Sequence, residues 1–218
     1  MKNVITGALL SVIICCYSCS KEKINGGGPV VTETRTVSGF TTVSAEGSSR
    51  VFITQGNNFE VKVKGYSNLL PYYETRLENN ILHLGYRSGV NVKHDNIEVY
   101  VTLPTLDGIR LSGSGDIRTS GAFNGSTLFE ASIAGSGNIF FSSGTTQQFN
   151  STIAGSGNIF AIDMLSNKAD VRVDGSGNTE IGVASELKVT ITGSGNVYYR
   201  GTPVITTQIT GSGTVLPR

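Results

Sequence analysis

Apolar and polar residues alternate along much of the chain, in short runs that glycines interrupt. Leu128–Ala134 and Leu187–Thr192 each place an apolar side chain at every second position. Because successive side chains of a strand point to opposite faces, this period of two predicts strands with one buried face. No helical periodicity intervenes between these runs, and we expect no long helix anywhere in the chain.

The second half of the chain is an internal repeat. Gly-Ser-Gly occurs six times from Gly113 onward, at spacings of 22, 20, 20, 18 and 18 residues. A repeat of this length is too short for a strand–helix–strand crossover. Each copy therefore predicts one coil of strands and corners, stacked on the next coil at roughly 4.8 Å. Like residues then form internal columns, namely Leu111, Ile133, Ile153, Val173, Ile191 and Ile209 before the corner, and Ile117, Ile139, Ile159, Thr179, Val197 and Val215 after it.

A polar residue follows each Gly-Ser-Gly corner. Glycine permits a positive φ and a close backbone approach at a sharp corner, where a Cβ atom would clash. Stacked amide side chains can hydrogen-bond from one coil to the next. We therefore expect a ladder in which an acid, interpreted as a corner cap rather than a catalytic group, heads a column of amides: Asp116, Asn138, Asn158, Asn178 and Asn196.

These features predict an all-β protein in which residues 105–218 form a parallel β-helix of about six Gly-Ser-Gly-cornered coils. Residues 33–104 are strand-like without a visible period, so we expect an irregular β section that packs on the helix or begins it. Residues 45–51 look like a degenerate copy of the corner. Asn79-Asn80 separates two strand candidates, Tyr72–Glu78 and Ile81–Tyr86, as a hairpin turn does.

The N-terminus has the pattern of a targeting segment. A basic start is followed by an apolar or small stretch, Val4–Ser18, which is short for a membrane span and typical of a signal peptide. The sequence around Cys19 resembles a bacterial lipoprotein processing site, so we expect a signal peptide over residues 1–18 and acylation of Cys19. The polar and glycine-rich residues 19–32 predict a lipid anchor and flexible tether. An ordinary secretion signal is the alternative.

Composition and charge narrow the function classes. The formal net charge is +1 and only 15% of the residues are charged, against about 25% in ordinary globular chains. A nucleic-acid partner is therefore not expected. The cysteines all lie at or before Cys19, and neither His83 nor His94 has a second ligand at metal spacing. We expect no metal and no cofactor.

The chain resembles a known family. The residues that carry the resemblance are Val37-Ser38-Gly39-Phe40, the pattern Val99-x-Val101-x-Leu103-Pro104-x-Leu106 and the repeated corners. Over residues 33–218 they are similar to the Bacteroidetes envelope proteins described as putative auto-transporter adhesins with a head GIN domain. The resemblance implies a right-handed parallel β-helix, an envelope location and an adhesin role, and it brings no established catalytic residues.

A carbohydrate-active enzyme, a polysaccharide lyase or hydrolase, is the first alternative, because parallel β-helices host such enzymes, although the fold alone does not establish the activity. A glycosidase would need two carboxylates about 5–9.5 Å apart that face one cleft. The strongest acidic cluster is Asp170, Arg172 and Asp174, but Lys188 should lie above Asp170 as an ion pair on a solvated face. The corner serines have no strand-to-helix context of a hydrolase elbow. We therefore expect no enzyme.

A second column of side chains should point outward just after the corners. Flat aromatic faces could stack on sugar rings, and exposed apolar patches often mark contact sites. The alternative is that the N-terminal section or a subunit neighbour covers this column. It consists of Arg118, Phe140, Phe160, Glu180, Tyr198 and Leu216, and the candidate ligand-binding residues are Arg118, Phe140, Phe160 and Tyr198.

The last coil, Thr206–Leu216, carries no charge. Such a coil presents an open sheet edge, which predicts pairing with another copy of the chain, or shielding by Pro217 and Arg218 alone. Taken together, the sequence predicts a non-enzymatic outer-membrane lipoprotein of the cell envelope, held to the membrane by its lipid. Its β-helical surface would bind a glycan or a host or cell-surface ligand. A structural envelope component is the remaining alternative.

Overall fold

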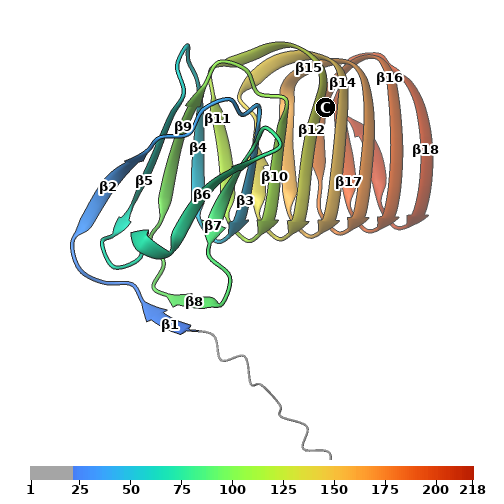
Figure 1. The fold of residues 1–218 in the computed structure, drawn as a ribbon. Coiled ribbons are helices and arrows are strands. Elements are labelled where there is room, and N and C mark those ends of the chain that lie inside the picture. The colour runs from blue at the N-terminus through green and yellow to red at the C-terminus, as the bar shows by residue number, and fades with distance from the viewer. Residues whose placement is uncertain (1–21) are drawn as a thin grey trace, which may run out of the picture.

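The computed structural model describes residues 22–218 (Figure 1), so the expected signal peptide and Cys19 lie outside the described residues. In this part of the chain the only helical element is one short 3-10 turn, η1 (Leu70–Tyr72). None of its helices is long and apolar enough to cross a bilayer. The parallel β-helix is confirmed, with about six turns over residues 108–217, preceded by a mixed sheet section.

One face of the β-helix is a ladder of parallel strands that all end at the corner glycines. The alternation of apolar and polar residues puts one side of each strand into the core. Along this ladder Gly113, Gly135, Gly155, Gly175, Gly193 and Gly211 lie in register. The strands are β10 (Gly108–Gly113) and the C-terminal parts of β12 (Ala122–Gly135), β14 (Ser143–Gly155), β15 (Asn158–Gly175) and β16 (Thr179–Gly193), followed by β18 (Val204–Gly211).

A second ladder begins directly after the corners. It contains β11 (Asp116–Ser120), β13 (Asn138–Phe140), the starts of β15 and β16, β17 (Asn196–Arg200) and β19 (Thr214–Pro217). The starts of β12 and β14 and the middle parts of β15 and β16 pair as a third ladder that closes each coil.

The corners explain why glycine recurs. Gly155 has a φ of +133°, and a Cβ atom there would lie 2.3 Å from the carbonyl oxygen of Gly135 in the coil before. The same carbonyl accepts hydrogen bonds from the backbone N–H groups of Ser156 (3.0 Å) and Gly157 (3.1 Å). Stacking the corners at this distance therefore excludes any side chain at Gly155.

The winding begins before the regular repeat. β3 (Thr42–Gly47) and β4 (Arg50–Gln55) form a coil whose Gly47 lies in register with Gly113, so the degenerate corner stacks on the later ones. The next layer outward is built by residues that come later in the chain, β7 (Ile81–Tyr86) and β9 (Glu98–Leu103), which pair in parallel with β3 and β4. The order of the layers in space thus differs from their order in sequence.

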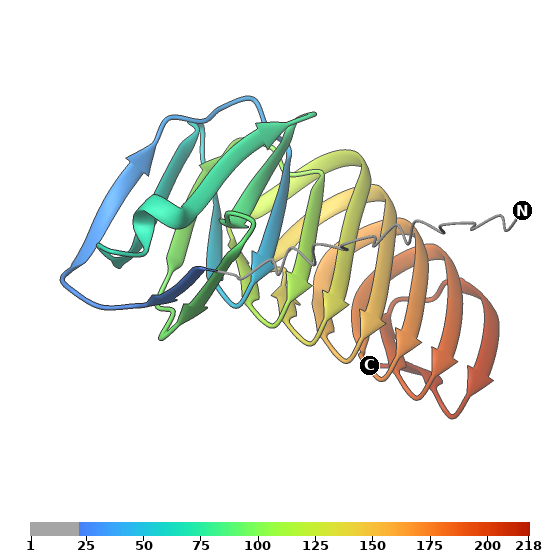
Figure 2. The same cartoon turned by 60° about the horizontal axis from the view of Figure 1, so that its bottom comes forward.

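Antiparallel strands cover this end of the stack (Figure 2). β5 (Glu60–Tyr66) pairs with β9, and β2 (Val30–Arg35) pairs with β5. β6 (Tyr73–Glu78) pairs with β7 through the hairpin turn expected at Asn79 and Asn80, whose φ angles are 50° and 62°. The far end of the stack has no such layer among the described residues, since β18 pairs only with β16.

The segment expected to be a flexible tether contains strands where it is described. β1 (Glu22–Asn25) pairs in parallel with β8 (Val90–Lys93) in a two-stranded sheet separate from the 17-stranded sheet, and β2 begins at Val30. The reason is tertiary contact: Ile24 packs against the hydrophobic core. A four-residue strand with one apolar residue gives too little periodicity to be recognised in the sequence.

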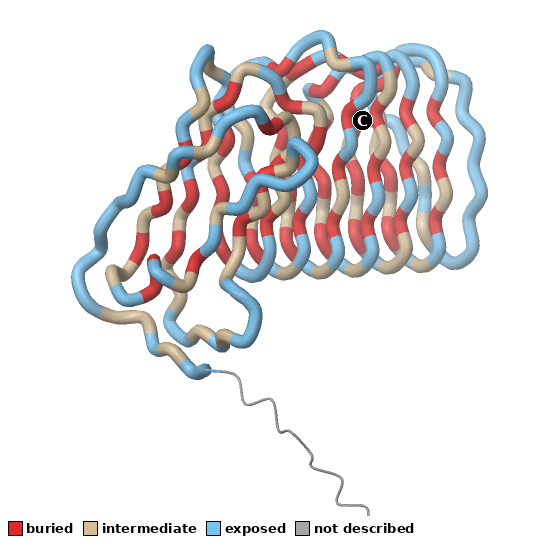
Figure 3. The backbone as a smooth tube through the Cα atoms, viewed as in Figure 1, coloured by how far each residue is buried: buried red, intermediate tan, exposed pale blue. Residues whose placement is uncertain are grey.

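The core runs along the axis of the β-helix, as the alternating buried and exposed positions show (Figure 3). Side chains at the predicted internal positions are buried in the central coils. In β18 the inward-facing Ile209 is 39% exposed, because no other strand of residues 22–218 stacks on the outer side of β18.

Candidate functional site

An outward column of side chains runs along the ladder that follows the corners. The six residues that the repeat predicts for this column, from Arg118 to Leu216, lie in register on adjacent strands. Two further members, on β9 and β4, continue it beyond Arg118. The outward column is Tyr100, Phe52, Arg118, Phe140, Phe160, Glu180, Tyr198 and Leu216.

Sequence reasoning missed Phe52 and Tyr100. The signal for Phe52 was present, because it stands two residues after Arg50, as Phe140 stands two residues after Asn138, and both follow a corner. For Tyr100 there was no such signal, since its strand joins the stack from an insertion without a corner motif.

The aromatic rings of the outward column stack on one another. The ring centroids of Phe140 and Phe160 are 4.8 Å apart at an interplanar angle of 14°, and those of Phe52 and Tyr100 are 5.2 Å apart at 16°. The guanidinium carbon of Arg118 lies 3.7 Å from the centroid of Phe140. Both faces of the Phe140 ring are therefore covered, one by a cation and one by an aromatic ring.

The far end of the outward column is chemically different. Glu180 lies in register between Phe160 and Tyr198, its side chain is only 14% exposed, and it forms an ion pair with Arg218. Tyr198 is half-buried, and Leu216 is 44% exposed. This end therefore combines an aromatic ring with a neutralised carboxylate and an exposed aliphatic side chain.

A hydrogen-bonded amide ladder runs beside the outward column. Each Asn side chain donates from Nδ2 to the Oδ1 atom of the residue in the coil before, at distances between 2.9 and 3.2 Å. From Asn178 onward the backbone N–H donates to that same Oδ1 atom. The ladder comprises Asp116, Asn138, Asn158, Asn178 and Asn196, and Thr214 continues it by donating to Asn196. It fixes the register of the strands that carry the column.

At the other end of the outward column a charged cluster surrounds Glu98. The Tyr100 hydroxyl donates to the Glu98 carboxylate at 2.9 Å, and Lys64 and Arg50 form ion pairs with it at 3.2 and 3.0 Å. The Tyr100 hydrogen bond, together with Lys64 and Arg50, lowers the pKa of Glu98, and the same hydrogen bond raises the pKa of Tyr100. The carboxylate thus stays ionised.

The acidic cluster on the ladder before the corners, Asp170, Arg172 and Asp174, is made of ion pairs. Lys188 lies in register with Asp170 and donates to it at 3.0 Å, and Arg172 donates to Asp174 at 2.8 Å. Each aspartate therefore has a cation of its own. Exposed pairs of this kind contribute little to stability.

The two histidines lie apart. His83 is half-buried on β7, and His94 follows β8, where its Nδ1 atom lies 2.6 Å from Oδ1 of Asn25. Residues 22–218 contain no group of three or more His, Cys, Asp or Glu side chains that is placed to hold a metal ion.

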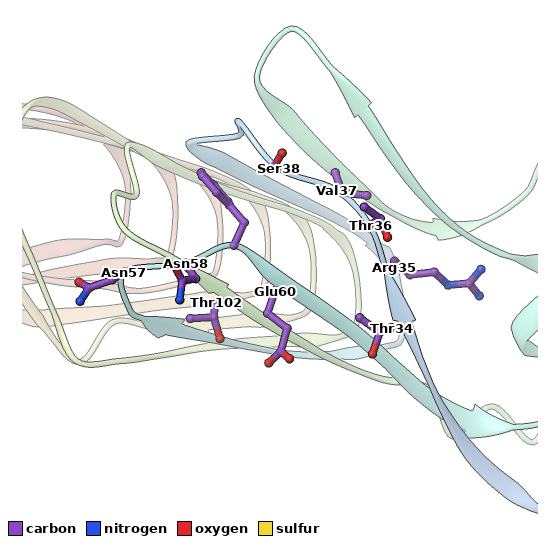
Figure 4. A pocket seen from close by; sticks show the side chains of 10 residues that line it. Thr34, Arg35, Thr36, Val37, Ser38, Asn57, Asn58, Glu60 and Thr102 are labelled. Carbon is purple, nitrogen blue, oxygen red and sulfur yellow. The ribbon is translucent and has the colours of Figure 1, made fainter.

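A groove of about 550 Å³ lies at the covered end of the stack (Figure 4), lined by the end of β2 and the residues after it, by the residues that lead into β5 and by Thr102 of β9. Its one carboxylate is Glu60, which pairs with Lys62 at 2.7 Å. Arg35 extends away from Asn57 and Asn58 and donates to the backbone carbonyl of Leu70. A two-carboxylate glycosidase needs a second acid across the groove, and its lining residues do not supply one.

The fold and the outward column define a class: β-solenoid proteins with a repetitive, rigid surface. The chain belongs to the family described as "Putative auto-transporter adhesin, head GIN domain", whose pattern matches residues 39–203. The resemblance inferred from the sequence is therefore confirmed.

Solved structures share this fold. A protein called a putative adhesin from Bacteroides fragilis has a TM-score of 0.71 at 20% identity, with 89% of this chain and 100% of that chain covered. A protein called a putative lipid binding protein from Parabacteroides distasonis has a TM-score of 0.60 at 22% identity, covering 90% and 100%. A putative adhesin from Parabacteroides merdae has a TM-score of 0.57 at 21% identity, covering 90% and 99%. No curated protein matches the chain.

Proposed function

We propose that this protein is a non-enzymatic lipoprotein of the bacterial outer membrane, and that the outward column is an adhesive surface for glycans on cells or in the matrix around them. The observation that carries the proposal is the in-register column itself. Eight side chains, four of them in stacked aromatic pairs, follow one line along the axis. Membership of an adhesin family supports the same interpretation.

The geometry separates contact residues from supporting ones. A sugar ring stacks on an aromatic face, and both faces of Phe140 are already covered. Among residues 22–218, Phe160 has an aromatic partner on one side only and Tyr198 has no stacked aromatic partner. Phe160 and Tyr198 should therefore make the ligand contacts, whereas Phe140 and Arg118 hold the Phe160 ring in place.

The test is glycan binding by the mature lipoprotein, measured on a glycan array and on cells that display glycans. Phe160→Ala and Tyr198→Ala should each weaken binding at least about tenfold, which corresponds to about 1.4 kcal/mol. The matched control is Leu165→Ala, which truncates an apolar side chain that is 54% exposed on a different strand ladder. Unchanged binding in both column variants, with the fold intact by circular dichroism, would falsify the proposal.

The lipid anchor has its own test. The intact mass of the mature protein should correspond to a chain that begins at Cys19 and carries acyl groups, and Cys19→Ser should abolish both the processing and the acylation. A mature chain that begins elsewhere and carries no lipid contradicts this part of the proposal without affecting the adhesive surface.

A further inference from the structure

The sheet formed by β1 and β8 fixes the N-terminus of the described chain to the body of the protein. The backbone N–H of Glu22 donates to the carbonyl of Gly89, and that of Gly26 donates to the carbonyl of Lys93, both at 2.8 Å. The Glu22 side chain pairs with Arg87 at 2.9 Å and accepts a hydrogen bond from Tyr72 at 3.2 Å. Glu22 is therefore anchored through both its backbone and its side chain.

This attachment limits how far the body can lie from a lipid on Cys19. Three residues of fully extended chain, from Cys19 to Glu22, span at most about 11 Å. A free tether from Cys19 to residue 33 would instead reach about 46 Å, or 14 residues at 3.3 Å each. A lipid on Cys19 therefore holds β1 and β8 next to the headgroups.

The outer face of this sheet has a chemistry that suits such a position. In the parallel register Ile24 lies opposite Val92, and these half-buried side chains pack toward the core. The alternate positions are exposed and carry no carboxylate: Lys23, Asn25, Asn91 and Lys93. Neither lysine forms an ion pair with another residue of the described chain.

We propose that this Lys23–Asn25–Asn91–Lys93 face is a docking surface for the phosphate headgroups of a bilayer. The β-helix is thereby held at the membrane surface, and no flexible tether separates it from the lipid. The proposal deepens the proposed function and rests on acylation of Cys19 for its full strength. Lysines near an anionic lipid surface are attracted to it over about one Debye length, so the contact should weaken with salt.

The experiment uses the acylated full chain in vesicles of phosphatidylethanolamine and phosphatidylglycerol that contain a nickel-chelating lipid. A fluorophore is placed at Asn91→Cys, or at Gln147→Cys as the exposed control on another part of the coil. Nickel ions at the vesicle surface quench a fluorophore that lies close to the headgroups. Quenching of the fluorophore at position 91 should therefore exceed quenching at position 147 severalfold. Inserting ten Gly/Ser residues between Lys21 and Glu22 should lower the quenching at position 91 partly. Adding Lys23→Gln and Lys93→Gln to that variant should lower it to the level measured at position 147. Equal quenching at the two positions in the acylated protein overturns the proposal.

A second measurement separates the docking surface from the lipid anchor. The intact mass of the same sample reports acylation. A Cys19→Ser chain produced without residues 1–18, and therefore unacylated, should still sediment with phosphatidylglycerol vesicles in a salt-sensitive manner, and Lys23→Gln with Lys93→Gln should abolish that binding. If the Cys19→Ser chain does not bind these vesicles even at low salt, the face has no affinity for headgroups and the docking proposal fails, whatever the state of Cys19.

Discussion

Gly113 lies in register with Gly47, although the strands β4 to β9 separate them in the chain. A Cβ atom on Gly113 would lie 2.3 Å from the carbonyl oxygen of Gly47, the same close approach that recurs at each later corner. The irregular first half of the chain is therefore continuous with the β-helix: it supplies the first coil and extends the stack outward.

The corner glycines should be among the least tolerant positions. Gly155→Ala combines a left-handed backbone with a clash against the Gly135 carbonyl, so we expect a loss of about 3 kcal/mol or more in the free energy of unfolding. Denaturant unfolding measures this loss. Gly27→Ala is the control, because its φ is ordinary and no atom lies within 4 Å of the added Cβ. Similar losses for the two variants would contradict the stacking argument.

The amide ladder should contribute measurably to stability. Asn158→Ala removes one bond donated to Asn138 and two accepted from Asn178, and it leaves half-buried polar groups without partners. We expect a loss of about 1–3 kcal/mol. Thr214→Ala, at the exposed end of the ladder, should cost less, and thermal unfolding of both variants gives the comparison. An Asn158→Ala protein as stable as the parent would show that water replaces the ladder at no cost.

Glu98 should make stability depend on pH in the acidic range. Its pKa in the folded state is below the ordinary value of 4.5, so the carboxylate stabilises the fold above that value, and this stabilisation is lost as the pH falls through the folded-state pKa. Glu98→Gln should therefore be less stable than the parent near neutral pH, and the difference should shrink below about pH 4.5. Tyr100→Phe, which removes the largest contribution, should reproduce part of the effect. A difference that stays constant down to about pH 3 would refute this assignment.

The Phe140–Phe160 pair should be energetically coupled. A double-mutant cycle with Phe140→Leu and Phe160→Leu should give a coupling free energy of about 0.5–1.5 kcal/mol, the range for stacked aromatic pairs. Phe140→Leu should also reduce glycan binding indirectly, by loosening the Phe160 ring. Additive losses would mean that the two rings touch without supporting each other.

The coils should behave as exchangeable units. Deleting residues 136–155 removes one coil, joins Gly135 to Ser156 and leaves equivalent residues in register. Repeat proteins are stabilised mainly by contacts between neighbours, so this variant should fold with a lower unfolding midpoint. Deleting residues 136–145 instead shifts every later strand out of register and should prevent folding. Circular dichroism and denaturant titration distinguish the two outcomes.

The repeat made the β-helix predictable, because equal spacing forces like residues to stack. Ile133, Ile153 and Ile191 had to share a column once each corner was aligned, and the amide ladder followed from the same alignment. The pairing of β9 with β4 could not be foreseen in this way. Val99 and Val51 belong to no common motif, and their contact arises from the path of the insertion.

Two features of the site depended on three-dimensional detail that no pattern encodes. Whether the Phe140 face is free or covered depends on side-chain rotamers, which stack the rings along the axis. Whether the segment around Glu22–Asn25 is a flexible tether or a strand depends on one residue, Ile24, packing against the core. The local sequence predicts a flexible tether over residues 19–32, and within its described part the tertiary contact of Ile24 accompanies a strand.

The inverted order of the first layers has a consequence for how the protein assembles. A chain that emerges N-terminus first cannot complete its closed end when β3 and β4 appear, because the layer outside them is made of β7 and β9, whose last residue is Leu103. The remaining coils can then add one after another onto a finished template. Assembly would thus start at one end of the stack and proceed in one direction, and the outward column would lengthen with each coil that is added.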